Sequence, residues 1–196
     1  MKRLGLAVLA VLSTTAFASE ETQSPWALSA TVGYTMGGDT IGTLNYEDDS
    51  SDSIKAGDGF ILGGALNYSL NQQFDIRFNA AYHFDSANAK NGDVTFSRFA
   101  LETIPYYKIN EQFKFGLGAG LDMAVELDND FADDAEFDNA GKLILSGMYS
   151  FESFNASLEL RYSVVEYELS NFAGYSYSNA PKMDGNHLGL LFHWNF

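Results

Sequence analysis

The stretch LGLLFHWNF, residues 188–196, is apolar at every second position, with Gly, Leu, His and Asn in between. This period of two is typical of a β-strand, in which successive side chains point to opposite faces. A free strand with one fully apolar face would be prone to aggregate in water. The stretch therefore predicts a strand that is paired along its edges and faces an apolar medium. Its apolar face comprises Leu188, Leu190, Phe192, Trp194 and Phe196.

The same alternation recurs along most of the chain. Residues 74–84, FDIRFNAAYHF, give the clearest example, with large apolar side chains at most even positions and polar ones at most odd positions. The phase of residues 96–106 is ambiguous, which is consistent with a β-bulge there. No segment has the period of a helix. We predict eight strands near residues 26–36, 60–68, 74–84, 96–106, 113–127, 140–149, 154–165 and 188–196.

The connections between these strands alternate between short and long. Two of the short ones are similar: SLNQQFDI and KINEQFKF share an Asn-x-Gln-Phe core, as expected of a repeated hairpin. Short turns on one side and long loops on the other are typical of an antiparallel barrel that crosses a membrane. The short turns are residues 69–73, 107–112 and 150–153, and the long connections are residues 37–58, 85–93, 127–139 and 168–185.

A soluble barrel of the lipocalin kind, with its apolar face turned inward, is the alternative. Two features favour the membrane. The strands have the length that a tilted bilayer crossing needs, roughly 9–11 residues. Aromatic residues also gather at both strand ends, as they do at membrane–water interfaces. They are Trp26, Tyr68, Phe74, Tyr106, Phe113, Tyr149, Phe154 and Trp194 on the short-turn side, and Tyr34, Phe60, Phe84 and Tyr162 on the other.

Residues 1–18, MKRLGLAVLAVLSTTAFA, contain two basic residues, an apolar run and an Ala-Phe-Ala sequence suited to cleavage. This order is typical of a secretory signal peptide, and the apolar run is too short for a membrane span. A short N-terminal hydrophobic anchor is the alternative. We expect cleavage after Ala18 and one barrel domain over residues 19–196.

The composition excludes two kinds of chemistry. The chain contains no cysteine, so disulfides, thiol catalysis and a lipidated cysteine are ruled out. It has 26 acidic and 11 basic residues, for a formal net charge of −15. Nucleic acid is therefore not a partner, because few bases are available to neutralise phosphates.

The strand pattern, the signal peptide and the aromatic final residue together resemble the small outer-membrane barrels of the OmpA/OmpX type. The predicted fold is all-β, an eight-stranded antiparallel up-and-down transmembrane β-barrel. The resemblance implies export to the outer membrane of a Gram-negative bacterium, contact with outer-membrane lipids and lipopolysaccharide, and a monomer. It also implies that the barrel-assembly machinery reads the last strand as a signal. The residues of this signal are Leu190, Phe192, Trp194 and Phe196.

The polar face of each strand lines the interior if the apolar face contacts lipid. An eight-stranded barrel is just wide enough for its own side chains to fill. Unpaired charges there would be costly, so a balanced set predicts a lumen filled by ion pairs. A path for protons or ions is the alternative. The predicted inward charges are Asp75, Arg77, Arg98, Glu102, Lys114, Asp122, Glu126, Lys142, Glu159 and Arg161.

Two of the long connections are acidic. Residues 127–139 do not fit a Ca²⁺-binding loop, because Ala132 and Asp133 stand where a ligand and the glycine are needed. Weak binding of divalent cations is one hypothesis, and a solvated surface of mutually repelling charges is the other. The residues concerned are Asp48, Asp49, Asp52, Asp128, Asp130, Asp133, Asp134 and Glu136.

The candidates for catalysis or a metal site are few. His83, His187 and His193 lie in three different strands or strand ends, and a metal would need further converging ligands. Residues 177–180, Tyr-Ser-Asn-Ala, are similar to the His-Tyr-Ser-Asn stretch of outer-membrane lipid A deacylases. Ser176 stands where those enzymes have their histidine base, so Ser178 has no activating group. We predict no catalytic, cofactor or metal site.

The sequence thus predicts a non-enzymatic barrel with acidic extracellular loops and a membrane-stabilising or surface-interaction role. A narrow channel or uptake barrel for small or hydrophobic solutes is the first alternative. A lipid A-modifying enzyme is the second.

Overall fold

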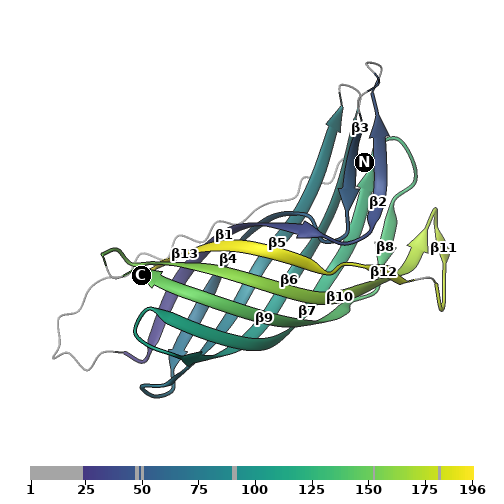
Figure 1. The fold of residues 1–196 in the computed structure, drawn as a ribbon. Helices are drawn as coiled ribbons and strands as arrows, with labels where there is room; N and C mark the ends of the chain where they lie inside the picture. The colour runs from purple at the N-terminus through teal and green to yellow at the C-terminus, as the bar shows by residue number, and fades with distance from the viewer. Residues whose placement is uncertain (1–23, 47–48, 50, 90–91, 152, 181) are drawn as a thin grey trace.

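A computed structural model describes residues 24–46, 49, 51–89, 92–151, 153–180 and 182–196. In these residues, eight long strands form a closed antiparallel ring in which each strand pairs with the next and the last pairs with the first. This confirms the predicted all-β, eight-stranded architecture (Figure 1). The ring consists of β1 (Trp26–Gly37), β4 (Gly59–Ser69), β5 (Phe74–Ala89), β6 (Gly92–Lys108), β7 (Phe113–Asn129), β9 (Ala140–Phe151), β10 (Ala156–Phe172) and β13 (His187–Asn195).

The stretch that ends the chain closes the ring. β13 pairs with β1 from Ser29 opposite Asn195 to Gly37 opposite His187. Its other edge pairs with β10. The backbone N–H of Phe196 donates to the carbonyl of Leu28, at 2.9 Å. The apolar strand therefore has no free edge, and its alternate side chains face outward from the ring.

No helix in the described residues is long and apolar enough to cross a membrane. The outward faces of the ring strands carry exposed large apolar side chains, Leu117, Leu143 and Leu160 among them. The inward faces carry buried polar and charged residues. Apolar outside and polar inside is the arrangement of a transmembrane barrel and the reverse of a soluble one.

Four ring strands are longer than predicted. β5, β6, β7 and β10 have 16 or 17 residues each and continue well past the ends of β1 and β4. The prediction of a long loop at residues 85–93 was therefore wrong, because both strands continue into that segment. We call these outer strand parts and the short strands beside them the extension (Figure 1). The short strands are β2 (Thr40–Asn45), β3 (Ser51–Lys55), β8 (Ala135–Phe137), β11 (Tyr175–Ser176) and β12 (Lys182–Asp184).

The inward and outward faces of β7 exchange where the extension begins. Ala124 in β7 has a positive φ of 48°, and the pairing of β6 with β7 shifts between Ser97 and Phe99. Three residue steps of β7 face two of β6 there, so the extra residue lies in β7, and the prediction of a bulge within residues 96–106 was wrong. A bulge inserts one residue and so reverses the alternation beyond it. Past Ala124, the apolar Val125 faces inward and Glu126 faces outward.

The extension has its own apolar core, to which β7 contributes after its change of phase and β5, β6 and β10 contribute without one. Phe96 lies at its centre, fully buried, with its ring 5.6 Å from those of both Phe137 and Tyr167. Residues from the hairpin of β2 and β3 and from β8 and β12 pack on this core. The buried members are Ile54, Ala56, Ala87, Val94, Phe96, Val125, Leu127, Ala135, Phe137, Ala140, Val165 and Tyr167.

The short turns explain the repeated Asn-x-Gln-Phe sequence. The side-chain oxygen of Asn71 accepts hydrogen bonds from the backbone N–H groups of Gln73 and Phe74, at 2.8 and 2.9 Å. Asn110 accepts the equivalent bonds from Gln112 and Phe113, at 3.0 and 2.8 Å. The asparagine thus satisfies backbone donors in both turns, as Asn side chains commonly do.

The prediction that Tyr106 belongs to an aromatic belt was wrong. Tyr106 faces inward, 2% exposed, and its hydroxyl lies 2.8 Å from that of Ser146. Its neighbour Tyr107 faces outward and packs against Phe74, with ring centres 5.4 Å apart. The prediction took the wrong phase of β6, because this strand carries large apolar residues on both faces, such as Ile104 inward and Leu101 outward.

Candidate functional site

The centre of the lumen is organised around Arg161 of β10. Its Nη1 donates to Glu102 at 2.8 Å, and its Nε and Nη2 donate to the two oxygens of Glu159, each at 2.9 Å. All three residues are buried. A guanidinium that meets one carboxylate through two parallel bonds is held in a fixed orientation. Arg161 therefore ties β10 to β6 across the interior.

Lys142 extends this network toward the extension. Its ammonium lies 2.8 Å from an oxygen of Glu102 and 2.8 Å from an oxygen of Asp122. The other oxygen of Asp122 accepts a 2.8 Å bond from the hydroxyl of Tyr167, a member of the apolar core. A continuous chain of charges thus runs from Glu159 to Asp122 and joins strands β6, β7, β9 and β10.

The short-turn end of the lumen holds a second group of charges. Asp75 lies 2.6 Å from the ammonium groups of both Lys108 and Lys114. Arg77 is bonded only to neutral partners in the described residues, among them Asn79 at 2.7 Å. His193 connects the two groups: its Nδ1 lies 2.7 Å from Arg77 and its Nε2 lies 2.8 Å from Glu159.

Arg98 marks the boundary between lumen and extension. Its side chain is fully buried, with Nη2 3.1 Å from His83 and Nε 3.9 Å from Asp122. The guanidinium also lies over the rings of Phe96 and Tyr167, 5.1 and 5.5 Å from their centres. Contact of a cation with aromatic faces is favourable in a site without water. Arg98 therefore connects the polar network to the apolar core.

The structure brings together most of the charges predicted for the lumen, but the balance differs. The placement of Glu126 in the lumen was wrong, because the bulge at Ala124 turns its side chain outward, onto the surface of the extension. Lys108 was missed, although counting by twos from Glu102 places it on the inward face. With Glu126 removed and Lys108 added, the five predicted acids become four and the five bases become six.

Little space is left beside the central charges of the lumen. A cavity of about 10 Å³ lies beside Glu102, Lys142 and Arg161. This volume corresponds to about one water molecule. At that level the lumen is filled by its own side chains, as the width of an eight-stranded barrel predicts.

Two of the histidines, His83 and His187, lie close together, but in the described residues each has other hydrogen-bond partners. His83 and His187 lie with ring centres 5.4 Å apart, but His83 is bonded to Thr35 and Arg98, and Nδ1 of His187 lies 2.8 Å from the carbonyl of Gly185. No group of three or more His, Cys, Asp or Glu residues suited to a metal ion occurs in the described part of the chain.

The deacylase-like stretch lies at the surface of the extension. Tyr177 follows β11 and is 47% exposed. All three histidines are buried in the ring instead, and among the described residues none is hydrogen-bonded to Ser178. The contacts required of a nucleophile and its base are therefore absent from this part of the structure.

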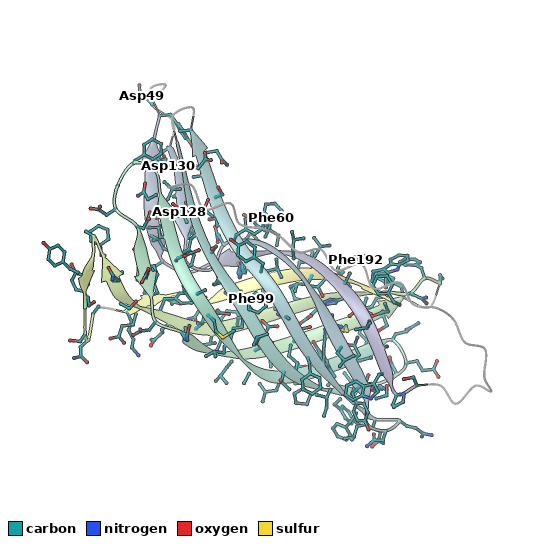
Figure 2. The ribbon with its side chains drawn as sticks, turned by 180° about the vertical axis from the view of Figure 1, so that it is seen from behind. Asp49, Phe60, Phe99, Asp128, Asp130 and Phe192 are labelled. Carbon is teal, nitrogen blue, oxygen red and sulfur yellow. The ribbon has the colours of Figure 1, made fainter. Side chains whose placement is uncertain are left out.

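The acidic residues of the long connections lie on the outside of the extension. Figure 2 shows Asp49 at its tip and Asp128 and Asp130 along one side. Glu126 and Glu136 stand directly opposite each other in the pairing of β7 with β8. Asp52, Asp133 and Asp134 are also exposed, whereas Asp48 lies outside the described residues.

These carboxylates affect one another. Partial burial, the charges of Asp134 and Asp130 and a hydrogen bond to Asp134 raise the pKa of Asp128. Partial burial and the charges of Asp128, Glu136 and Asp134 likewise raise the pKa of Glu126. Like charges on facing strands destabilise the pairing. The apolar core beneath them has to offset this repulsion.

No family model and no curated protein sequence matches the chain. Several solved structures are similar in fold. Neisserial surface protein A is 13% identical, with a TM-score of 0.49 and coverage of 88% of this chain and 98% of that one. Ail, the attachment invasion locus protein of Yersinia pestis, is 15% identical, with a TM-score of 0.46 and coverage of 87% and 97%. The outer-membrane protein AlkL is 12% identical, with a TM-score of 0.42 and coverage of 95% and 97%.

These similarities concern the fold alone. The closed ring, its apolar outer face and its charged interior define the class directly: the chain is a small eight-stranded β-barrel of the outer-membrane type.

Proposed function

We propose that this protein is a non-enzymatic barrel of the outer membrane whose lumen is closed and whose extension acts at the cell surface. One observation carries the proposal. The same strands form a charge-filled interior at the level of the lipid and a separately packed, acidic body beyond it. A channel needs the first region to be open, whereas a surface-contact protein needs the second to be rigid.

The network in the lumen favours closure over conduction. Lys142 and Arg161 are each bonded to two carboxylates, and the side chains involved are 4% exposed or less. Moving one of these groups would leave a partner charged, buried and unpaired, which costs several kcal/mol, roughly 3–5. An ion passing through would have to break these contacts one after another.

The extension favours contact with positively charged partners. Its outer surface carries many carboxylates, and of the bases described there, Lys182 is already 3.3 Å from Glu166. Divalent cations that bridge to lipopolysaccharide, and basic surfaces of other molecules, fit this charge. No nucleic acid fits it. The enzyme alternative lacks support in the described residues, where Ser178 has no hydrogen bond to a histidine.

The remaining parts of the proposal concern export and assembly. The predicted signal peptide, residues 1–18, lies outside the described residues, and we retain it as the export signal. We further propose that Leu190, Phe192, Trp194 and Phe196 are read by the barrel-assembly machinery before β13 closes on β1. Short turns would then lie in the periplasm and the extension outside.

Electrical recording tests closure directly. Purified protein inserted into a planar bilayer should give no steady conductance above that of the lipid alone. A steady, ion-selective current from the wild-type protein would show that the lumen is open, and the channel alternative would replace this proposal.

Labelling of intact cells tests the orientation. The chain has no cysteine, so single substitutions can be labelled without background. A membrane-impermeant maleimide should react with Asp49→Cys and Asp133→Cys but not with Gln72→Cys or Glu111→Cys in the short turns. The opposite pattern would reverse the proposed topology.

Binding to basic surfaces tests the role of the extension. Cells that display the wild-type protein should adhere to polylysine-coated beads more than cells without it. Replacing Asp128, Asp130, Asp134 and Glu136 by their amides should remove most of the difference, whereas Glu111→Gln in a short turn should not. Equal adhesion by both variants would show that the carboxylates of the extension do not mediate the contact.

A further inference from the structure

The wall of the barrel contains a groove on its outer side, where the ring meets the extension. β9 begins only at Ala140, whereas its neighbours β7 and β10 continue past that level and are bridged by β8. The segment of Asp138 and Asn139 crosses this step, and the N–H of Asp138 donates to the carbonyl of Glu168 at 2.9 Å. The result is a groove of about 760 Å³ between β7, β9, β10 and β12.

The part of the groove toward the ring is apolar and built from small residues. Ala119, Gly120 and Gly141 form it together with Leu143 and Val164. Leu143 and Val164 are 62% and 43% exposed and face outward. A Cβ atom placed on Gly141 would meet no other atom within 4 Å, so space lies directly above this residue. An alkyl chain can lie along such a surface without displacing a side chain.

The part of the groove toward the extension is acidic. Asp138, Glu166, Glu168 and Asp184 line it, and Lys182 is the one base among them with an exposed side chain. Lys182 lies 3.3 Å from Glu166, so four acids minus one base leave three uncompensated negative charges. Lys142 also lines the groove, but its ammonium is turned inward and bonded to Glu102 and Asp122.

The change from apolar to acidic coincides with the edge of the lipid-facing band. Along β10 the outward residues Leu158, Leu160, Tyr162 and Val164 are followed by Glu166. The groove therefore spans the level at which acyl chains give way to head groups. Its volume is within the range of small-molecule sites, about 300–1,000 Å³.

We propose that this groove binds a cationic amphiphile, with an alkyl chain against Gly141 and Leu143 and an ammonium group among the carboxylates of Asp138, Glu166 and Asp184. The uncompensated negative charge of the groove favours a cationic occupant. An anionic head group would meet three uncompensated negative charges, whereas an ammonium group would neutralise part of them. The groove shares Lys142 with the lumen network, and the proposal does not depend on the role proposed for the extension.

The test compares two photoreactive probes that differ only in the head group. Both have one alkyl chain with a diazirine near the head, and one ends in trimethylammonium and the other in sulfate. The protein is studied whole, in nanodiscs of zwitterionic lipid, and labelled peptides are identified by mass spectrometry. We expect the ammonium probe to label the segments of β9, β10 and β12 around the groove about tenfold more than the sulfate probe, equivalent to about 1.4 kcal/mol.

Two glycines of β9 provide a matched pair of variants. Gly141 and Gly147 both face outward, and a Cβ atom on either would meet nothing within 4 Å, but only Gly141 lines the groove. Gly141→Phe should fill the apolar part and lower ammonium labelling several-fold. Gly147→Phe should leave it unchanged. Heat-modifiable migration in gels checks that both variants fold.

A second pair of variants tests the acidic part. Glu166→Gln with Asp138→Asn should reduce the preference for the ammonium head group. Asp133→Asn with Glu136→Gln, which removes two carboxylates elsewhere on the extension, should preserve it. Labelling spread evenly around the ring, equal labelling by both probes, or the same loss in both glycine variants would each overturn the proposal, because ordinary contact with membrane lipid would then explain the result.

Discussion

Four long strands run through both the lumen and the core of the extension, yet the interiors of these two regions are opposite in character. At the level of the lipid the inward side chains are Glu102, Lys142, Arg161 and their partners. Beyond it they are Phe96, Val125, Leu127 and Val165. The difference teaches that the medium outside decides what lies inside: apolar side chains face the lipid where there is lipid, and one another where there is water.

Among the four long strands, β7 alone changes phase between the two regions, because it contains one inserted residue. In β5, β6 and β10 the alternation keeps its phase, and the inward residues change from polar to apolar along one face: Phe96 shares the inward face of β6 with Glu102, and Tyr167 that of β10 with Arg161. The bulge at Ala124 shifts the phase by one and exchanges the two faces. The bulge thus turns the apolar residues of β7 inward at the boundary between the membrane-embedded ring and the body above it.

The largest effect on the free energy of unfolding is expected from substitutions in the lumen. Arg161→Met removes the partner of Glu102 and Glu159 and leaves both carboxylates buried, which should lower the free energy of unfolding by roughly 3–5 kcal/mol. Adding Glu159→Gln should recover part of this loss. Unfolding by urea in lipid vesicles measures both. Lys182→Met breaks the exposed pair with Glu166 and should cost less than about 1 kcal/mol. An equal cost for both single variants would mean that the lumen is solvated.

A somewhat smaller and more local effect is expected in the core of the extension. Phe137→Ala should leave a cavity beside Phe96 and destabilise the extension by about 3 kcal/mol. The ring should keep its heat-modifiable migration, because β8 is not one of its strands. Limited proteolysis should therefore cut the extension faster while the ring stays intact. Unfolding of the ring in the same variant would show that the two regions are not separable.

The smallest effect on the stability of the extension is expected from a change in pH. Partial burial and the neighbouring charges of Asp134 and Asp130 raise the pKa of Asp128 above its ordinary value. A carboxyl whose pKa is raised by folding contributes stability below its unfolded pKa, and this contribution is lost as the pH rises through the folded pKa. Proteolysis of the extension should thus be slightly slower at pH 4 than at pH 7. Asp134→Asn should weaken this dependence, and an unchanged dependence would contradict the proposed cause.

The sequence was sufficient for the ring, because every ring strand except β6 shows a clear period of two. Most of the lumen charges could be assigned from the same period, counted from Glu102 or Asp75. Glu126 could not, because an alanine gives no local signal that its backbone will take a positive φ. The groove could not be found either, since it depends on where β9 begins relative to β7 and β10.

The central claim is that the faces of β7 exchange at Ala124, and single-cysteine labelling tests it most directly. Cysteines at positions 121, 125, 126, 127 and 128 would be treated with a water-soluble maleimide in lipid vesicles. We predict fast reaction at Glu126→Cys and Asp128→Cys, and slow reaction at Leu121→Cys, Val125→Cys and Leu127→Cys. Fast reaction at positions 125 and 127 with protection at 126 would mean that the alternation continues unbroken, and the account would be wrong.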